Sequence, residues 1–355
     1  MSLNAHFYKH TLNFRFDAGT SRGVLKKKDS YFIKIYDSQS PETFGIGEAG
    51  PLFGLSLDFE TAEIKLKLIC ELINEKGLEV ADLESIIESL DSFSSVKFAL
   101  ETALLNFKSK QTGLVFNNSF FKKSTPIAIN GLIWMGDLDF MQSQIKEKIN
   151  EGYSTIKLKI GAIDFEEELR LIKGIRSQFS ENEMCIRVDA NGAFSLDNVE
   201  QKLHRLSDLQ IHSIEQPIKA GQHEAMAKLC EKNILPIALD EELIPNYDRK
   251  ETLLNEIKPQ FIILKPSLMG GLSGSKDWIN TAEKLNIGWW MTSALESNVG
   301  LNAICQFCAE FKNPLPQGLG TGKLYTNNFE SPLIIQKGEI FYDKTKDWDL
   351  DFFNL

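Results

Sequence analysis

Five charged residues recur along the middle of the chain at nearly constant spacing. They are Lys159, Asp189, Glu215, Asp240 and Lys265, separated by 30, 26, 25 and 25 residues. Each follows a short apolar run. Carboxylates that meet at one place can hold a divalent cation, and a lysine beside that cation can act as a base. This pattern predicts metal-assisted removal of a proton next to a substrate carboxylate, which produces an enolate.

The three acids are predicted to bind the metal. An all-oxygen ligand set suits a hard ion, so we expect Mg²⁺, with Mn²⁺ able to substitute. Asp189, Glu215 and Asp240 would repel one another at adjacent strand ends unless a cation lay among them. The alternative is that each acid is an ordinary surface residue. Three acids in successive units, each after a buried run, favour the metal.

The lysines have the spacing of inward-facing strand residues. Lys157 and Lys159 are two apart, so a strand directs both side chains to the same face. Together with Lys265 they would repel one another, and burial would add to this effect. We therefore expect the pKa of at least one lysine to be lowered toward that of a usable base. The alternative is a strand with one solvent-exposed face.

Repeating βα units must position these residues. Between the apolar runs lie helical patterns, for example Leu196, Val199, Leu203 and Leu206, with Ser195 as the expected N-cap, and a second helix after Asp164. Eight such units predict a parallel barrel, whose strand ends meet at one rim. An open doubly wound sheet is the alternative, but no glycine-rich phosphate turn is present. The expected strands are Pro126–Trp134, Thr155–Ile160, Met184–Val188, Ile211–Ile214, Ile234–Leu239, Phe261–Leu264, Gly288–Met291 and Leu315–Leu319.

The flanking segments differ from the barrel pattern. We predict an α+β capping domain over residues 1–120, the catalytic barrel over 121–323, and a C-terminal segment, 324–355, that packs back on the capping domain. The first 120 residues contain strand-like and then helix-like runs: Leu12–Phe16, Tyr31–Tyr36, Thr43–Glu48, Phe59–Asn74, Leu83–Leu90 and Ser94–Ser109.

The composition indicates which binding partners and which cellular compartment to expect. The formal net charge is −10, which disfavours binding to nucleic acid or to an anionic membrane. The five cysteines are scattered, which is typical of a reducing compartment. No signal-peptide or membrane-spanning pattern is visible, so a cytoplasmic protein is expected. Oligomeric state is not predicted.

The motifs together resemble the enolase superfamily, in its muconate-lactonising subgroup. They are K-x-K (Lys157, Lys159), D-x-N (Asp189, Asn191), I-E-Q-P (Ile214–Pro217), L-D-E (Leu239–Glu241) and K-P-S…G-G-L (Lys265–Leu272). The resemblance implies a modified, (β/α)7β-like barrel with an N-terminal capping domain. It also implies Mg²⁺ on the three acids, Lys159 as the acid/base with Lys157 beside it, and Lys265 across the substrate. Asn191 and Glu241 would support the site.

Within that subgroup, Thr292–Ser297 is similar to the corresponding segment of o-succinylbenzoate synthases, and Gly19–Gly23 resembles their capping loop. Those enzymes dehydrate a cyclohexadiene carboxylate in menaquinone biosynthesis. Dipeptide epimerases carry an Asp-x-Asp where this chain has Gly318–Gly322, without an acid. The resemblance therefore favours a small anionic carboxylate substrate without an amine. The residues that it implies near the substrate are Ser293, Glu296, Ser21 and Arg22.

Two alternatives stay open. An epimerase or an N-acylamino acid racemase would use Lys159 and Lys265 as opposed proton carriers, and both designs keep both lysines. A barrel retained only for binding is the non-enzymatic alternative, which the intact lysines and acids disfavour.

Overall fold

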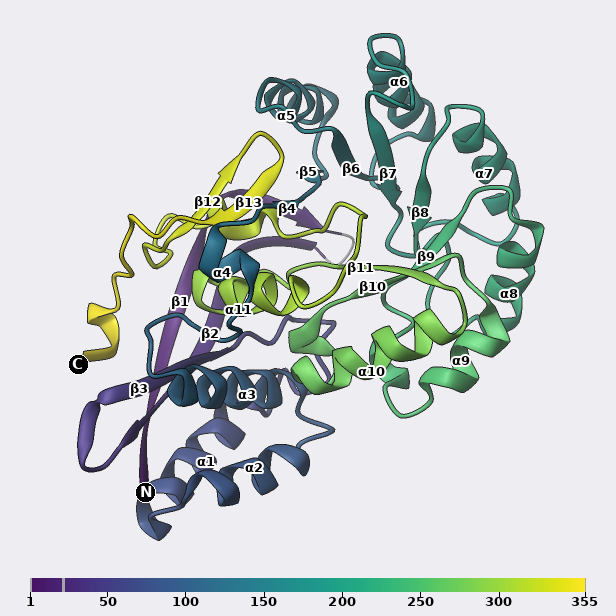
Figure 1. The fold of residues 1–355 in the computed structure, drawn as a ribbon. Coiled ribbons are helices and arrows are strands. Elements are labelled where there is room, and N and C mark those ends of the chain that lie inside the picture. Colours follow the sequence, from purple (N-terminus) through teal and green to yellow (C-terminus); the bar gives the residue numbers. More distant parts are fainter. Residues whose placement is uncertain (1, 21–22, 355) are drawn as a thin grey trace.

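The computed structural model describes residues 2–20 and 23–354, and three sheets organise them (Figure 1). One is antiparallel and N-terminal, one is a parallel sheet of seven strands, and the third is a small sheet near the C-terminus. In this part of the chain, no helix has the length and apolar character needed to cross a bilayer.

The N-terminal sheet contains β1 (Leu3–Thr20), β2 (Gly23–Asp37) and β3 (Ser40–Ala49). Helices α1 (Ala62–Lys76), α2 (Val80–Glu88) and α3 (Ser94–Ser109) follow. β3 packs directly on α3. The two backbones approach so closely that a Cβ on Gly47 would overlap the Ala99 carbonyl oxygen. The expected α+β arrangement is confirmed. The strands are longer than the sequence predicted, since β1 and β2 pair far beyond their apolar centres, with a register shift between Asn13 and Ala18.

The parallel sheet forms the barrel wall in the order β11-β10-β9-β8-β7-β6-β5, so strands adjacent in sequence are adjacent in space. Its strands are β5 (Gly131–Ile133), β6 (Thr155–Lys159), β7 (Cys185–Asp189), β8 (Ser213–Glu215), β9 (Ile237–Leu239), β10 (Phe261–Leu264) and β11 (Gly288–Met291). The predicted bounds of β10 and β11 are correct.

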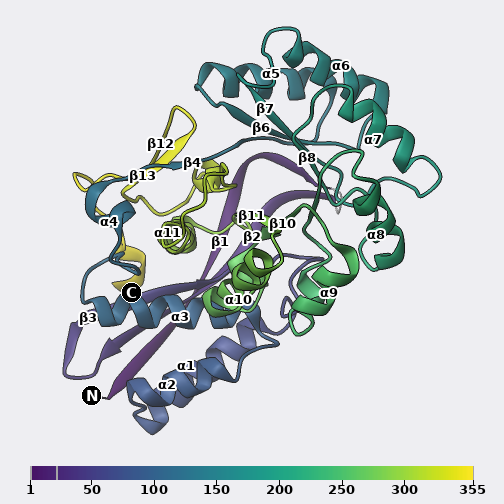
Figure 2. The same cartoon turned by 45° about the vertical axis from the view of Figure 1, so that its right-hand side comes forward.

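The barrel helices run around the outside of this sheet (Figure 2). They are α5 (Leu138–Asn150), α6 (Phe165–Arg176), α7 (Val199–Ser207), α8 (His223–Lys232), α9 (Lys250–Ile257), α10 (Gly271–Lys284) and α11 (Asn298–Cys308). The helix expected after Asp164 is α6, and Asp164 caps it by accepting from the Glu166 amide at 2.9 Å. Ser195 is not the N-cap of α7. Asn198 takes that position, and Leu196 is 53% exposed, because the helix starts one turn later than the apolar spacing suggested.

The eighth position of the barrel is occupied by Gln317 and Gly318, which form single bridges rather than a strand. Gln317 bridges Ile129 on one side, and Gly318 bridges Thr292 on the other. The Gln317 amide donates to the Ala128 carbonyl at 2.8 Å, and the Gly318 amide donates to the Met291 carbonyl at 2.7 Å. The eighth strand predicted at Leu315–Leu319 is therefore reduced to these two bridges, which still close the ring of the (β/α)7β-like barrel.

The barrel interior below the rim is filled by side chains. The Arg187 guanidinium lies 4.0 Å from the centre of a Trp290 ring and donates to the Pro316 carbonyl at 2.7 Å. The His212 ring packs against Phe261 at 5.2 Å between centroids. As in other barrels of this type, the interior is a packed core and not a pore.

The C-terminal segment contacts both parts of the molecule. After α4 (Ser119–Lys123), β4 (Ile127–Ala128) pairs with β13 (Glu339–Tyr342), which pairs with β12 (Leu333–Gln336). We expected the C-terminal segment, including the apolar runs Pro332–Ile335 and Glu339–Tyr342, to pack on the capping domain. For the β12–β13 hairpin that these runs form, the expectation is wrong, because β13 pairs with the open edge of β4. The end of the chain does reach the capping domain, where Phe353 packs on Phe32 and its carbonyl accepts from Tyr8 at 2.9 Å.

Candidate active site

The strand-end acids and lysines form one row across the rim. Lys159 is the register partner of Asp189, and Asp189 is the partner of Glu215. Asp240 and Lys265 each come directly after their strands, β9 and β10. All three acids are buried, with exposed fractions of 0% for Asp189, 3% for Glu215 and 0% for Asp240. The structure thus brings together the five residues that the strand-end pattern selected.

Each lysine of the row contacts an acid. Lys157 and Lys159 both approach Asp189 Oδ2 at 3.0 Å, as expected for two side chains on the same strand face. Lys157 also forms an ion pair with Glu215, and Lys265 forms one with Asp240. The ammonium groups therefore lie between the carboxylates.

These ion pairs set the charge state of the row. Burial lowers the pKa of Lys157, but Asp189 and Glu215 raise it more, so the net pKa is above the ordinary value. For Lys265, burial is outweighed in the same way by Asp240 and Glu241. The expectation that crowding lowers a lysine pKa is therefore wrong for these two lysines, because each has anionic neighbours that outweigh both burial and the other ammonium groups.

The pKa values of the acids are shifted as well. Burial raises the pKa of Asp189, yet Lys157 and Lys159 hold it well below its usual range. The pKa of Glu215 is well above its usual range, first because of burial and next because of the adjacent Asp189. The pKa values of these two adjacent buried carboxylates are therefore shifted in opposite directions.

The donor set fits a divalent cation. Asp240 Oδ1 is buried and has no hydrogen-bond partner among the described residues. With the raised pKa of Glu215, this orphaned oxygen indicates room for a further cation among hard oxygen donors. Lysine ammonium groups occupy the space between these carboxylates. For this reason, no group of three acidic, cysteine or histidine side chains among the described residues is already arranged around a common metal position.

Asn191 connects two members of the site. Its amide oxygen accepts from Lys159 Nζ at 2.9 Å, and its Nδ2 donates to Glu241 at 3.0 Å. Its backbone amide donates to Asp189 Oδ1 at 3.0 Å. These contacts fix the orientation of Lys159. Glu241 lies behind Asn191 and does not line the cavity that opens over the row.

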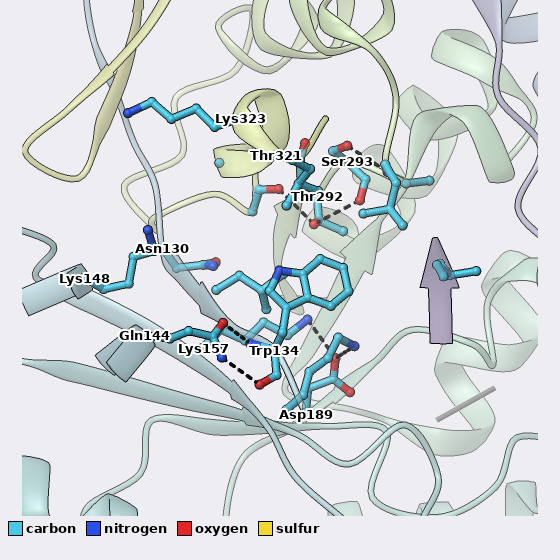
Figure 3. A pocket seen from close by; sticks show the side chains of 18 of the residues that line it. Asn130, Trp134, Gln144, Lys148, Lys157, Asp189, Thr292, Ser293, Thr321 and Lys323 are labelled. Atoms are coloured by element: carbon cyan, nitrogen blue, oxygen red, sulfur yellow. Dashed lines mark hydrogen bonds and ion pairs between the residues drawn. The ribbon is translucent and has the colours of Figure 1, made fainter. Parts of the chain in front are cut away.

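A cavity of about 560 Å³ opens over the row. Lys157, Lys159, Asp189, Glu215 and Lys265 line its polar side. The opposite side is apolar and includes residues of both domains: Phe16, Leu25, Leu52, Leu55, Trp134, Phe140, Leu295 and Leu324. Figure 3 shows the Trp134 indole between the Lys157–Asp189 group and the pair Thr292 and Ser293. The cavity has the size of a small-molecule site, and its lining combines an apolar side with a polar, charged side.

The loop after β11 forms one wall of the cavity. Ser293 lines it, whereas Glu296 is fully buried behind the loop and accepts from the Ser293 hydroxyl at 2.6 Å and from the Ala294 amide at 2.7 Å. Leu295 adopts a left-handed backbone with φ of 65°. That conformation is unfavourable for a branched side chain and persists only where neighbours enforce it. Tyr325 supports it by donating to the Leu295 carbonyl at 2.7 Å.

Ser21 and Arg22 lie outside the described residues. On either side of them in the sequence, Phe16 on β1 and Leu25 on β2 line the cavity. Gly19 also forms a bridge with Met135, just beyond β5.

Sequence reasoning missed the aromatic wall. Trp134 lies one residue past β5, at the same kind of strand end that identified the acids. Its backbone amide and carbonyl are both bound by Gln144, at 2.9 and 3.1 Å. The predicted strand Pro126–Trp134 ended on this residue, and its position at the rim was the available signal. Phe16, Leu52 and Leu55 come from the other domain and carry no comparable signal.

This barrel and its site define a class of protein. A family model described as enolase C-terminal domain-like matches residues 141–344. The chain belongs to this family and has the fold of the enolase superfamily. The muconate lactonizing enzyme from Pseudomonas putida shares that fold, with a TM-score of 0.79, 19% identity and 96% and 94% of the two chains covered.

More particular similarity lies with o-succinylbenzoate synthases. The chain is 44% identical to the o-succinylbenzoate synthase of Desulfotalea psychrophila, with 95% of this chain and 98% of that one covered. The crystal structure of MenC from the same organism has a TM-score of 0.85 and 39% identity, covering 96% and 100% of the chains. An L-Ala-D/L-Glu epimerase of Francisella tularensis subsp. novicida is 26% identical over 60% of each chain.

Proposed function

We propose that this protein is an o-succinylbenzoate synthase, which dehydrates a cyclohexadiene carboxylate by syn β-elimination through an enediolate. The observation that carries the proposal is the pairing of a lysine-and-carboxylate rim with a cavity wall that has no acid on Gly318–Gly322. The 44% identity to a synthase of this name supports it. In this proposal the protein acts in menaquinone biosynthesis, in the cytoplasm. The five cysteines form no disulfide in the described structure, in keeping with a reducing compartment.

Lys159 is assigned the proton transfers. It is held by Asp189 at 3.0 Å and by Asn191 at 2.9 Å, and its side chain lines the cavity. As the free amine it takes the proton from the carbon next to the substrate carboxylate. The resulting ammonium then gives that proton to the departing hydroxyl, so that the carbon–oxygen bond breaks and water leaves. One lysine can serve both steps because both occur on the same face.

Lys265 and Lys157 are assigned electrostatic roles. Both line the cavity at the acids, and both have a raised pKa that keeps them cationic. A fixed positive charge near the substrate carboxylate stabilises the enediolate more than the substrate, because the negative charge there increases.

Asp189, Glu215 and Asp240 would hold the magnesium ion. When bound, it would neutralise charge on the enediolate oxygens, a role that manganese can also fill. The superfamily supports this assignment, since a dipeptide epimerase from Enterococcus faecalis with the same fold was solved as a complex with Mg. The preference of Mg²⁺ for hard oxygen donors supports the same assignment.

The cavity suits an anionic substrate without an amine. Of the acids that line it away from the rim, Glu147 and Glu151 both contact Lys148, at 3.0 and 2.7 Å. An ammonium group on a substrate would therefore compete with Lys148. Arg15 and Lys323 also line the cavity and add positive charge for a second carboxylate.

The test is an assay of the purified protein with Mg²⁺ against both substrate classes. We expect loss of the diene absorbance with formation of the aromatic product, and no α-hydrogen exchange of dipeptides in D₂O. A protein that epimerises dipeptides rapidly and leaves the cyclohexadiene unchanged would refute the proposal. Lys159→Ala serves as the control for background dehydration of this labile substrate.

A further inference from the structure

The N-termini of α10 and α11 differ from those of the other barrel helices. Among the described residues, α5 to α9 each have an acidic residue in the first turn, which stabilises the exposed amides of a helix N-terminus. The first turns of α10 and α11 contain none. The N-cap of α10 is Gly270, which has no side chain to accept a hydrogen bond. Neither helix therefore has an acidic residue of its own at this end, although in α11 the Ser297 hydroxyl accepts from the Val299 amide at 3.2 Å.

Glu101 of α3 supplies the charge at α10. It accepts from the Leu272 amide at 2.5 Å, the Ser273 amide at 3.2 Å and the Ser273 hydroxyl at 2.5 Å. The glycine pair of the G-G-L motif makes this approach possible. A Cβ on Gly271 would overlap a Glu101 carboxylate oxygen, and its φ of +75° is one that other residues rarely adopt.

Glu48 of β3 supplies the charge at α11. It is fully buried and accepts from the Ser297 amide at 2.9 Å, the Ser297 hydroxyl at 2.5 Å and the Gly300 amide at 3.0 Å. In an ordinary capping box, two residues of the helix bind these N-cap and N3 amides. Here one carboxylate from the other domain binds both, and a Cβ on Gly300 would lie 2.9 Å from it.

Both helix ends adjoin the catalytic loops. Lys265 lies five residues before Gly270, and the Gly270 amide donates to Ser94 of the capping domain at 3.0 Å. The cavity wall from Ser293 to Leu295 directly precedes the Ser297 cap. Ser267 donates to Glu296, so the two loops are also connected to each other.

We propose that Glu48 and Glu101 are positioning residues, which hold the loops of Lys265 and Ser293–Leu295 in their productive conformation by capping barrel helices from the capping domain. Docking of β3 and α3 on the barrel thereby completes the active site, although neither carboxylate lines the cavity. The kinetic test rests on the proposed function, because it uses that reaction as its readout.

The experiment compares Glu101→Gln and Glu48→Gln with Asp82→Asn. Asp82 is the matched control: it caps α2 by accepting from the Glu79 amide at 2.9 Å, and α2 lies on the far side of α3 from α10 (Figure 2). We expect Glu101→Gln to lower kcat about tenfold or more with little change in KM, because it displaces Lys265 by a fraction of an ångström. Glu48→Gln should chiefly raise KM, by a similar factor.

Asp82→Asn should leave kcat and KM within about twofold of the native values at equal distance below each Tm. If both glutamate variants also stay within twofold while losing thermal stability, the residues are structural only and the proposal is overturned. A native protein that lacks synthase activity refutes the proposed function instead, and the hydrogen-exchange test below then decides the present proposal.

Hydrogen exchange of the native protein gives a test that needs neither variant nor substrate. With rising urea, amides of residues 265–273 and 293–300 should lose protection together with those of α3 and β3, because one docking event orders them all. Loss of protection in both loops while α3 and β3 stay protected would overturn the proposal. This measurement also decides the case if a glutamine variant does not fold.

Discussion

Lys159 carries the proton transfers of the proposed reaction, so its removal has the clearest expected result. Lys159→Ala should lower kcat by about 100-fold or more, the usual contribution of a positioned general base. Lys159→Arg keeps the charge beside Asp189 but loses the basic amine, so it should be equally inactive. Steady-state assays with circular dichroism of both variants check this. An alanine variant that retains a tenth of the activity would show that another group is the base.

His212 gives a pH dependence of stability that is separate from the rim. Burial, and next Arg187, lower the pKa of His212 from 6.5 to about 4. Between these values the unfolded chain binds a proton that the folded chain does not. Stability is therefore fully present above pH 6.5 and falls as the pH drops toward 4. The slope for one such proton approaches about 1.4 kcal/mol per pH unit.

Urea unfolding from pH 7 to pH 4 measures this slope in the native protein and in His212→Asn. The asparagine retains a polar group near the Ser213 hydroxyl, which lies 2.9 Å from the imidazole, but it does not titrate. We expect the variant to have the shallower dependence. Parallel curves for the two proteins would show that His212 does not contribute.

At the residue scale, the sequence predicted which charged groups meet. Lys157, Lys159 and the acids could be found because strand ends recur once per unit and the strand period fixes the face. The resulting pKa values could not be predicted, because they depend on which carboxylate each ammonium contacts. Glu48 and Glu101 could not be found either, since each acts on a helix about 170 to 250 residues away in the sequence.

Among the elements, the closing position of the barrel tolerates little change. A Cβ on Gly318 would overlap the Thr292 hydroxyl and lie 2.7 Å from the Thr292 Cβ. Gly318→Ala should therefore separate this segment from β11 and cost about 1–3 kcal/mol, as other overpacked sites do. Thermal and urea unfolding give the value.

Gly174 in α6 is the matched control for that substitution. It lies in a helix, and a Cβ there would meet nothing within 4 Å. Gly174→Ala should stabilise the protein by about 0.5–1 kcal/mol, because alanine loses less backbone entropy in a helix. Equal effects of the two substitutions would contradict the assigned packing.

The elements themselves were predictable to different degrees. Short buried strands such as β10 and β11 were predicted with their correct ends, because both faces are covered and the apolar run is continuous. The long β1–β2 hairpin was underestimated, since residues 3–11 of β1 and 23–30 of β2 mix polar and apolar side chains and contain no continuous apolar run. The β12–β13 hairpin was placed on the wrong partner, because pairing with β4 depends on an open edge that no local pattern reveals.

For the whole molecule, metal binding should couple to stability. An ion that binds only the folded rim at 100 times its Kd adds about 2.7 kcal/mol. We expect Mg²⁺ to raise the Tm and EDTA to reverse the change, as calorimetry would record. Asp240→Asn should abolish most of the shift, since it removes a buried donor. If the native enzyme is active with Mg²⁺ but its Tm does not change at millimolar Mg²⁺, the metal site is not saturated at that concentration and the prediction is wrong.

The bridges that close the barrel also have a consequence for ligand exchange. Gln317 and Gly318 join the two edges of the seven-stranded sheet, and Gly318, Asn130 and Thr292 all line the cavity. A molecule that contacts Asn130 and Thr292 together would span this seam and favour its closed state. Product in the cavity should then slow amide exchange at residues 317 and 318.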